Sequence, residues 1–177
     1  RRRFSRAALS MRKGSAKTEL AALIAAVELH PEGPVRCGGF DGHGNPQGRP
    51  VTDPYIPILA YTEEQASDLC YGALKAILEE SRVAGDFDIG LERVMRRRGD
   101  GVAKALAAAP NARDGARTTF QVFDESWHYT LLKLIQAHTT MLANIPKRPI
   151  ADPWSLETTT AYEPGQGSVA EHTFDQA

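Results

Sequence analysis

Two short motifs, far apart in the chain, constrain the fold more than any other feature. The first, Met11–Glu19, reads MRKGSAKTE and stands directly before an alanine-rich helical pattern. The second, Phe120–Glu125, reads FQVFDE and ends an apolar strand pattern with two acidic residues. A loop before a helix offers backbone N–H groups and an ammonium to a polyphosphate, while carboxylates at a strand end suit a metal and an attacking water. In this order the motifs predict an α/β domain that hydrolyses ATP.

The first motif supplies the predicted phosphate-binding residues. We expect the lysine ammonium of Lys17 to contact the phosphates and the hydroxyl of Thr18 to bind Mg²⁺. The pattern departs from a full phosphate loop, because Met11 and Ala16 stand where glycine is usual, and a Cβ at Ala16 restricts the backbone. The residues expected to line the nucleotide are Lys13, Gly14, Ser15, Ala16, Lys17, Thr18 and Glu19.

The second motif supplies the predicted metal ligand and catalytic base. We expect Asp124 to hold the metal through water and Glu125 to polarise the attacking water. A helicase-type DExH motif would place histidine at position 127, but Trp127 stands there and histidine follows at His128. The spacing therefore argues against a helicase, although a DNA helicase or translocase with a phosphate loop remains an alternative.

Composition limits the other function classes. The chain has 177 residues, which fits one domain, and a formal net charge of -1. This charge gives no global attraction to nucleic acid, so DNA contacts would have to come from local patches such as Arg1–Arg3 or Arg96–Arg98. Cys37 and Cys70 have no CxxC partner, and the sequence predicts no zinc site. No apolar run approaches the roughly 20 residues of a membrane span.

Periodicity and turn residues predict alternating helices and strands. Helices are expected at 17–29, 62–80 and 131–142, and from Ser168 onward. In the first helix, Leu20, Leu23, Ile24 and Val27 form an apolar stripe, and the second begins with a capping box from Thr62 to Gln65. Strands are expected at 55–60, 91–97, 102–107, 118–123 and 154–161, an exposed hairpin or loop at 31–54, and a turn at 111–115. This alternation predicts a layered α/β domain.

Four stretches resemble the ATPase domain of the large terminase subunit of tailed phages, especially phages of actinobacteria. They read RKGSAKTE (12–19), IPILAYTEEQA (56–66), DGARTTFQVFDE (114–125) and LETTTA (156–161). The Gly-rich FDGHGNP (40–46) and GSVAE (167–171) also match. The resemblance implies a P-loop NTPase of the ASCE type, with a central, mostly parallel sheet flanked by helices. It also implies that a degenerate phosphate loop is tolerated.

The resemblance implies further roles. Arg12 or Lys13 would sense the γ-phosphate, and Thr158–Thr160, in particular Thr159 and Thr160, would couple hydrolysis to movement. The implied cofactors are ATP and Mg²⁺. The implied partners are double-stranded DNA, further copies of the chain in a ring, a portal protein and the small terminase subunit, in the cytoplasm of the host cell and without a membrane. Residues 1–177 would be part of the ATPase domain, with the adenine-contacting segment and the nuclease domain outside them.

Two alternatives stay open at this point. A decayed nucleotide-binding module that serves only assembly would explain Met11 and Ala16. The run Arg96–Arg98 suits a solvated turn, but it could also supply an arginine to the γ-phosphate of a neighbouring subunit.

Overall fold

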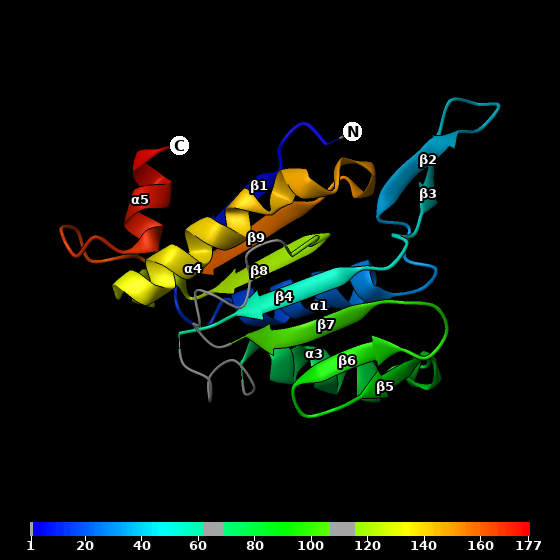
Figure 1. Ribbon diagram of the computed structural model, residues 1–177, viewed down its shortest axis with the longest axis horizontal. Helices are drawn as coiled ribbons and strands as arrows, with labels where there is room; N and C mark the ends of the chain where they lie inside the picture. Colours follow the sequence, from blue (N-terminus) through cyan, green and yellow to red (C-terminus); the bar gives the residue numbers. More distant parts are fainter. Residues whose placement is uncertain (1, 62–68, 107–115) are drawn as a thin grey trace.

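A seven-stranded sheet with helices on both faces forms the centre of the protein (Figure 1). The computed structural model describes residues 2–61, 69–106 and 116–177. Across the sheet the strands are β1 (Arg6–Ser10), β9 (Trp154–Thr159), β8 (Phe120–Asp124), β4 (Tyr55–Leu59), β7 (Val102–Leu106), β6 (Arg93–Arg96) and β5 (Phe87–Ile89). The first five are parallel to one another, and β6 pairs antiparallel with both of its neighbours, β7 and β5. The predicted α/β fold with a mostly parallel sheet is confirmed.

In the described residues, four α-helices accompany the sheet. They are α1 (Lys17–Leu29), α3 (Cys70–Glu79), α4 (Leu132–Ala143) and α5 (Val169–Asp175). Short 3₁₀ turns follow the main elements as η1 (Ala84–Asp86), η3 (Ser126–His128), η4 (Ile145–Lys147) and η5 (Pro149–Ala151). Helix α4 connects the parallel neighbours β8 and β9, and α1, which lies between β1 and β4 in the chain, covers the opposite face of the sheet (Figure 1).

Strand β8 is buried on both faces because it separates two hydrophobic cores. Phe120 and Val122 pack into the core that includes α1 and α3, whereas Phe123 packs into the core beneath α4. Gln121, also on the α4 side, donates from its side-chain nitrogen to the carbonyl of Met141 at 2.6 Å. The alternation of side chains along a strand therefore fixes Phe120–Phe123 in the two cores and leaves Asp124 at the carboxyl end of β8.

Helix α1 packs through its small residues. Ala21, Ala22 and Ala25 are fully buried, and small side chains allow a helix to approach a sheet closely. Three residues of the predicted apolar stripe lie on the outer side instead, Leu23 at 49% exposure, Leu20 at 43% and Val27 at 46%, while Ile24 packs against the core. Helical spacing alone could not distinguish the two faces, because both are apolar.

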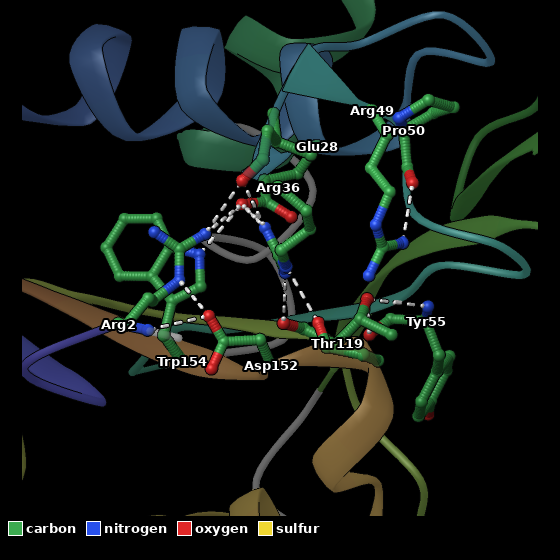
Figure 2. Close-up of polar contacts among 11 residues, drawn as sticks. Arg2, Glu28, Arg36, Arg49, Pro50, Tyr55, Thr119, Asp152 and Trp154 are labelled. Carbon is green, nitrogen blue, oxygen red and sulfur yellow. Dashed lines mark hydrogen bonds and ion pairs between the residues drawn. The ribbon is translucent and has the colours of Figure 1, made fainter. Parts of the chain in front are cut away.

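A hairpin of β2 (Arg36–Phe40) and β3 (Pro46–Arg49) projects from the body of the domain (Figure 1). Its base is fixed by a buried polar network, which Figure 2 shows. Arg36 donates to a carboxylate oxygen of Glu28 at 2.8 Å and to the carbonyl of Ala151 at 2.7 Å. Arg2 and the indole of Trp154 donate to the same Glu28 oxygen, at 3.2 and 2.8 Å. One buried carboxylate therefore joins the hairpin, α1 and the start of β9.

Most of the predicted elements are confirmed. The helix at 17–29, the exposed hairpin, the doubtful strand from Val102 and the N-cap at Ser168 are all present, and the Ser168 hydroxyl accepts from the N–H of Glu171 at 3.2 Å. The sequence did not predict β1 or β5. The start of the helix predicted from Thr62, its capping box at Gln65, the end of the 102–107 strand and the turn at 111–115 lie outside the described residues.

Candidate functional site

The register of three parallel strands brings the two sequence motifs together. Ser10, the last residue of β1 before the phosphate loop, pairs with Thr159 on β9. On the other side of β9, Thr158 pairs with Asp124 at the end of β8. The carboxyl ends of parallel strands meet at one edge of a sheet, where α/β proteins bind their ligands. Both motifs therefore lie at the same edge.

The backbone of the predicted phosphate loop has two residues in the left-handed region, which glycine adopts most readily. Gly14 has φ +80° and Ala16 has φ +54°, in the left-handed region. Ala16 is the N-cap of α1, and its carbonyl accepts the N–H of Leu20 at 2.9 Å. The N–H groups of a first helical turn precede the intrahelical ladder, and they are free to bind an anion. Ala16 thus takes the conformation expected of a glycine, at a cost in strain.

Lys17 is buried, with 5% of its surface exposed. Its ammonium lies 3.4 Å from a carboxylate oxygen of Glu125. Helix α1 is packed against β8 and β9, so its first residue points into the edge of the sheet. The contact joins the two motifs directly.

Asp124 is the most enclosed acid of the site, at 1% exposure. The hydroxyl of Thr158 donates to its Oδ1 at 2.6 Å, and the Thr18 hydroxyl lies 3.1 Å from Oδ2. Burial raises the pKa of Asp124, while the hydrogen bonds from Thr158 and Thr18 act in the opposite direction. The two residues predicted as the metal pair, Thr18 and Asp124, are therefore in direct contact.

Glu125 begins the turn after β8 in a left-handed conformation, with φ +53°. Its Oε2 accepts the indole N–H of Trp127 at 2.9 Å and the backbone N–H of Thr160 at 3.3 Å. Its Oε1 is the oxygen that faces Lys17. This strained backbone and these donors hold the carboxylate at the edge of the sheet beside the phosphate loop.

The remaining predicted site residues lie around this centre. The Thr159 hydroxyl accepts the backbone N–H of Trp127 at 3.2 Å and donates to the carbonyl of Thr160 at 2.9 Å. Arg12 and Lys13 are exposed, on the loop between β1 and α1. The loop also includes Ser15, and Glu19 lies exposed in the first turn of α1.

Arg96 occupies a different part of the fold. Its guanidinium donates to the carbonyls of Leu29, His30 and Val51, at 2.6, 2.9 and 3.1 Å, which caps the C-terminal end of α1. Arg97 donates to the carbonyl of Phe87 at 2.8 Å. These two arginines hold loops together at the end of α1 away from Lys17, so the solvated-turn interpretation does not describe Arg96.

Sequence reasoning missed two residues of the site. Trp127 was noted only because it is not histidine, yet its indole contacts the predicted base. Glu157 is buried on β9 and accepts hydrogen bonds from Ser126 at 2.7 Å and Thr173 at 3.0 Å. A charged residue in the middle of a predicted strand, between Leu156 and Thr158, was the available signal for Glu157. It links the turn after Glu125 to α5.

The donor set fits Mg²⁺ and a nucleoside triphosphate. A hydroxyl and a carboxylate are the oxygen ligands that Mg²⁺ combines with water and phosphate. Free N–H groups and the ammonium of Lys17 complement a polyphosphate. In residues 2–61, 69–106 and 116–177 no group of three or more His, Cys, Asp and Glu side chains is placed to hold a metal ion, so substrate oxygens and water would have to complete the coordination of Mg²⁺.

Known structures share this architecture. The HK97 bacteriophage large terminase superposes with a TM-score of 0.72 and 17% identity, over 98% of this chain and 32% of that protein. The large terminase ATPase domain of Thermus phage P74-26 superposes with a TM-score of 0.57 and 18% identity, over 87% of this chain and 58% of that domain. This chain has the fold of a phage large terminase ATPase domain. The predicted resemblance is thus confirmed at the level of the fold.

One curated relative is detected by sequence. The Gene 13 protein of Mycobacterium phage L5 is 25% identical over an alignment of 177 residues, which covers 93% of this chain and 28% of the relative. This chain therefore spans less than a third of that protein. No family model matches the sequence. No helix in the part of the chain that the structure describes is long and apolar enough to cross a bilayer.

Proposed function

We propose that this chain is the ATPase motor of a phage DNA-packaging terminase, and that it uses Mg²⁺ and ATP to drive double-stranded DNA into a procapsid. The observation that carries this proposal is the convergence of Lys17, Thr18, Asp124 and Glu125 at one edge of the sheet. Lys17 lies 3.4 Å from Glu125, and Thr18 lies 3.1 Å from Asp124. Two motifs that are distant in sequence thus form one site of the composition that phosphoryl transfer requires.

In this mechanism each side chain has a distinct task. The first turn of α1 and the ammonium of Lys17 bind the phosphates. Thr18 and Asp124 would hold Mg²⁺, which neutralises charge on the phosphate oxygens when it is bound. Glu125 orients the attacking water and accepts its proton. Arg12 or Lys13, exposed on the same loop, is positioned to sense the γ-phosphate.

Coupling to movement would involve the end of β9. The Thr159 hydroxyl contacts the backbone of Trp127, and the N–H of Thr160 contacts Glu125. A movement of the Glu125 side chain would therefore alter its contact with Thr160 and shift the segment that leads to α5. A packaging motor of this type would act as a ring of copies on double-stranded DNA, with a portal protein and the small terminase subunit, in the host cytoplasm.

A helicase or translocase and a decayed assembly module are the competing proposals. The helicase would unwind a duplex, whereas the packaging motor would move duplex DNA into a procapsid without unwinding it. The decayed module would not turn over ATP. The left-handed backbone of Ala16 weakens the case for decay, because the loop keeps its shape despite the missing glycine.

The experiment measures ATP binding and turnover in the full-length protein and in its variants at Lys17 and Glu125. Lys17→Ala should abolish nucleotide binding, because its ammonium is the group expected to contact the β and γ phosphates. Glu125→Gln should bind ATP yet lose turnover by about 10²-fold or more. Lys75→Ala is the matched control, since Lys75 pairs with Glu79 on the surface of α3. Unchanged ATP affinity in Lys17→Ala, by calorimetry on folded protein, would refute the phosphate loop, and unchanged turnover in Glu125→Gln would refute the base.

A further inference from the structure

We propose that Trp127 is a positioning residue for the catalytic carboxylate: its indole N–H holds Oε2 of Glu125 so that Oε1 accepts the proton of the attacking water. This inference rests on the proposed ATPase function and deepens it. It concerns a residue two positions beyond the base, outside the phosphate loop and the acidic pair.

The two oxygens of Glu125 have different surroundings. Oε2 accepts two hydrogen bonds, from the indole of Trp127 at 2.9 Å and from the backbone of Thr160 at 3.3 Å. Oε1 faces the ammonium of Lys17 at 3.4 Å. An oxygen that already accepts two donors is the weaker proton acceptor. A polyphosphate would compete with Oε1 for the Lys17 ammonium, which leaves Oε1 available to water.

The indole is itself held on two sides. The backbone N–H of Trp127 donates to the hydroxyl of Thr159 at 3.2 Å. Its ring lies against His128, with ring centroids 3.6 Å apart and an interplanar angle of 32°. His128 in turn contacts the ring of Tyr61, with centroids 5.2 Å apart. A donor fixed in this way loses little entropy when it binds a carboxylate, so its hydrogen bond orients Glu125 effectively.

The proton transfer defines what this orientation achieves. As the water oxygen bonds to the γ-phosphorus, one O–H bond of that water breaks and its proton moves to Oε1 of Glu125. The bond between the γ-phosphorus and the β–γ bridging oxygen breaks, and that oxygen leaves with ADP. A rotated carboxylate would present the wrong oxygen, and small misplacements of a catalytic group reduce the rate strongly.

The test is Trp127→Phe in the full-length protein, because phenylalanine keeps an aromatic ring and the backbone donor to Thr159 while it removes the indole N–H. We expect kcat to fall about 10- to 100-fold, as for the loss of one hydrogen bond to a charged group. ATP affinity and KM should stay within about twofold, because the indole contacts the base and not the phosphates. The chain has two tryptophans, so Trp154→Phe is the matched control. Trp154 donates to Glu28 at 2.8 Å, at the opposite end of the sheet, and its replacement should leave kcat unchanged.

A double-mutant cycle separates positioning from structure. If Trp127 acts through Glu125, Trp127→Phe should lower turnover in the parent but have no further effect in a Glu125→Gln background. An equal fall in both backgrounds, a kcat unchanged in Trp127→Phe, or a fall in kcat that follows a lowered melting temperature would each overturn the inference. Absence of ATP turnover in the parent protein would instead refute the proposed function, so the two failures are distinguishable.

Discussion

The hydroxyl of Thr158 should be one of the main supports of the ionised Asp124. Thr158 is fully buried, Asp124 is 1% exposed, and the hydrogen bond between them is 2.6 Å long. Thr158→Val keeps the shape of the side chain and removes the donor. A hydrogen bond to a charged group contributes about 1.5–3 kcal/mol, and Asp124 would keep only the longer contact with Thr18 at 3.1 Å. We therefore expect the free energy of unfolding to fall by about 2 kcal/mol at neutral pH.

The effect should depend on pH. Burial raises the pKa of Asp124, and the hydrogen bond from Thr158 lowers it, so the valine variant should have a still higher pKa at this carboxyl. With a pKa above that of the unfolded chain, the folded state binds more protons between the two values, and stability falls as pH rises through that window. In the valine variant this pH window extends to higher pH, because the folded-state pKa of Asp124 is its upper limit. Its penalty is therefore largest at neutral pH and shrinks on acidification, as Asp124 becomes protonated in both proteins.

Thermal unfolding at neutral and mildly acidic pH measures this effect. For a chain of this size about 2 kcal/mol corresponds to a drop in melting temperature of roughly 4–8 °C. Thr158→Ser is the control, because it keeps the hydroxyl and loses one methyl group, which costs about 1 kcal/mol at either pH. A valine penalty that is the same at both pH values, or smaller than the serine penalty, would refute this account of Asp124.

Three further predictions concern the network at the hairpin, the phosphate loop and the end of β9. Arg36→Met should lower the free energy of unfolding in urea by about 3 kcal/mol, because the buried Glu28 loses the nearer of two arginines and keeps Arg2 at 3.2 Å, and adding Glu28→Gln should recover part of that loss; no recovery would show that the charge is not the cause. Ala16→Gly should raise the melting temperature slightly, since relief of about 1–2 kcal/mol of left-handed strain exceeds the entropic cost of glycine, and a lower melting temperature would contradict it. Thr159→Val should bind ATP but package little DNA in a procapsid assay, because Trp127 loses a backbone contact, and normal packaging would remove Thr159 from the coupling mechanism.

Short-range sequence patterns were enough to predict several helices, turns and site residues of this protein. Lys17 to Leu29 is a helix because alanine and leucine favour one and His30-Pro31 ends it. Residues 31–54 form a hairpin because glycine and proline restrict the chain to turns there. The motifs that contain Lys17 and Asp124 can each be recognised from short-range residue spacing. Because the carboxyl ends of parallel strands meet at one edge of a sheet, the two motifs were expected to form one site.

The tertiary structure decided what periodicity leaves ambiguous. Leu23 is exposed and its neighbour Ala22 is buried, and only packing against β8 and β9 assigns the alanines of α1 to the core. The short segment Arg6–Ser10 contains two alanines, which are poor strand formers, yet it is a strand because β9 supplies its hydrogen-bond partners. The contacts of Glu125 with Trp127 and Thr160, and of Asp124 with Thr158, join residues on two strands and the turns that follow them. Such contacts depend on strand register, which arises from long-range pairing and has no local signature in the sequence.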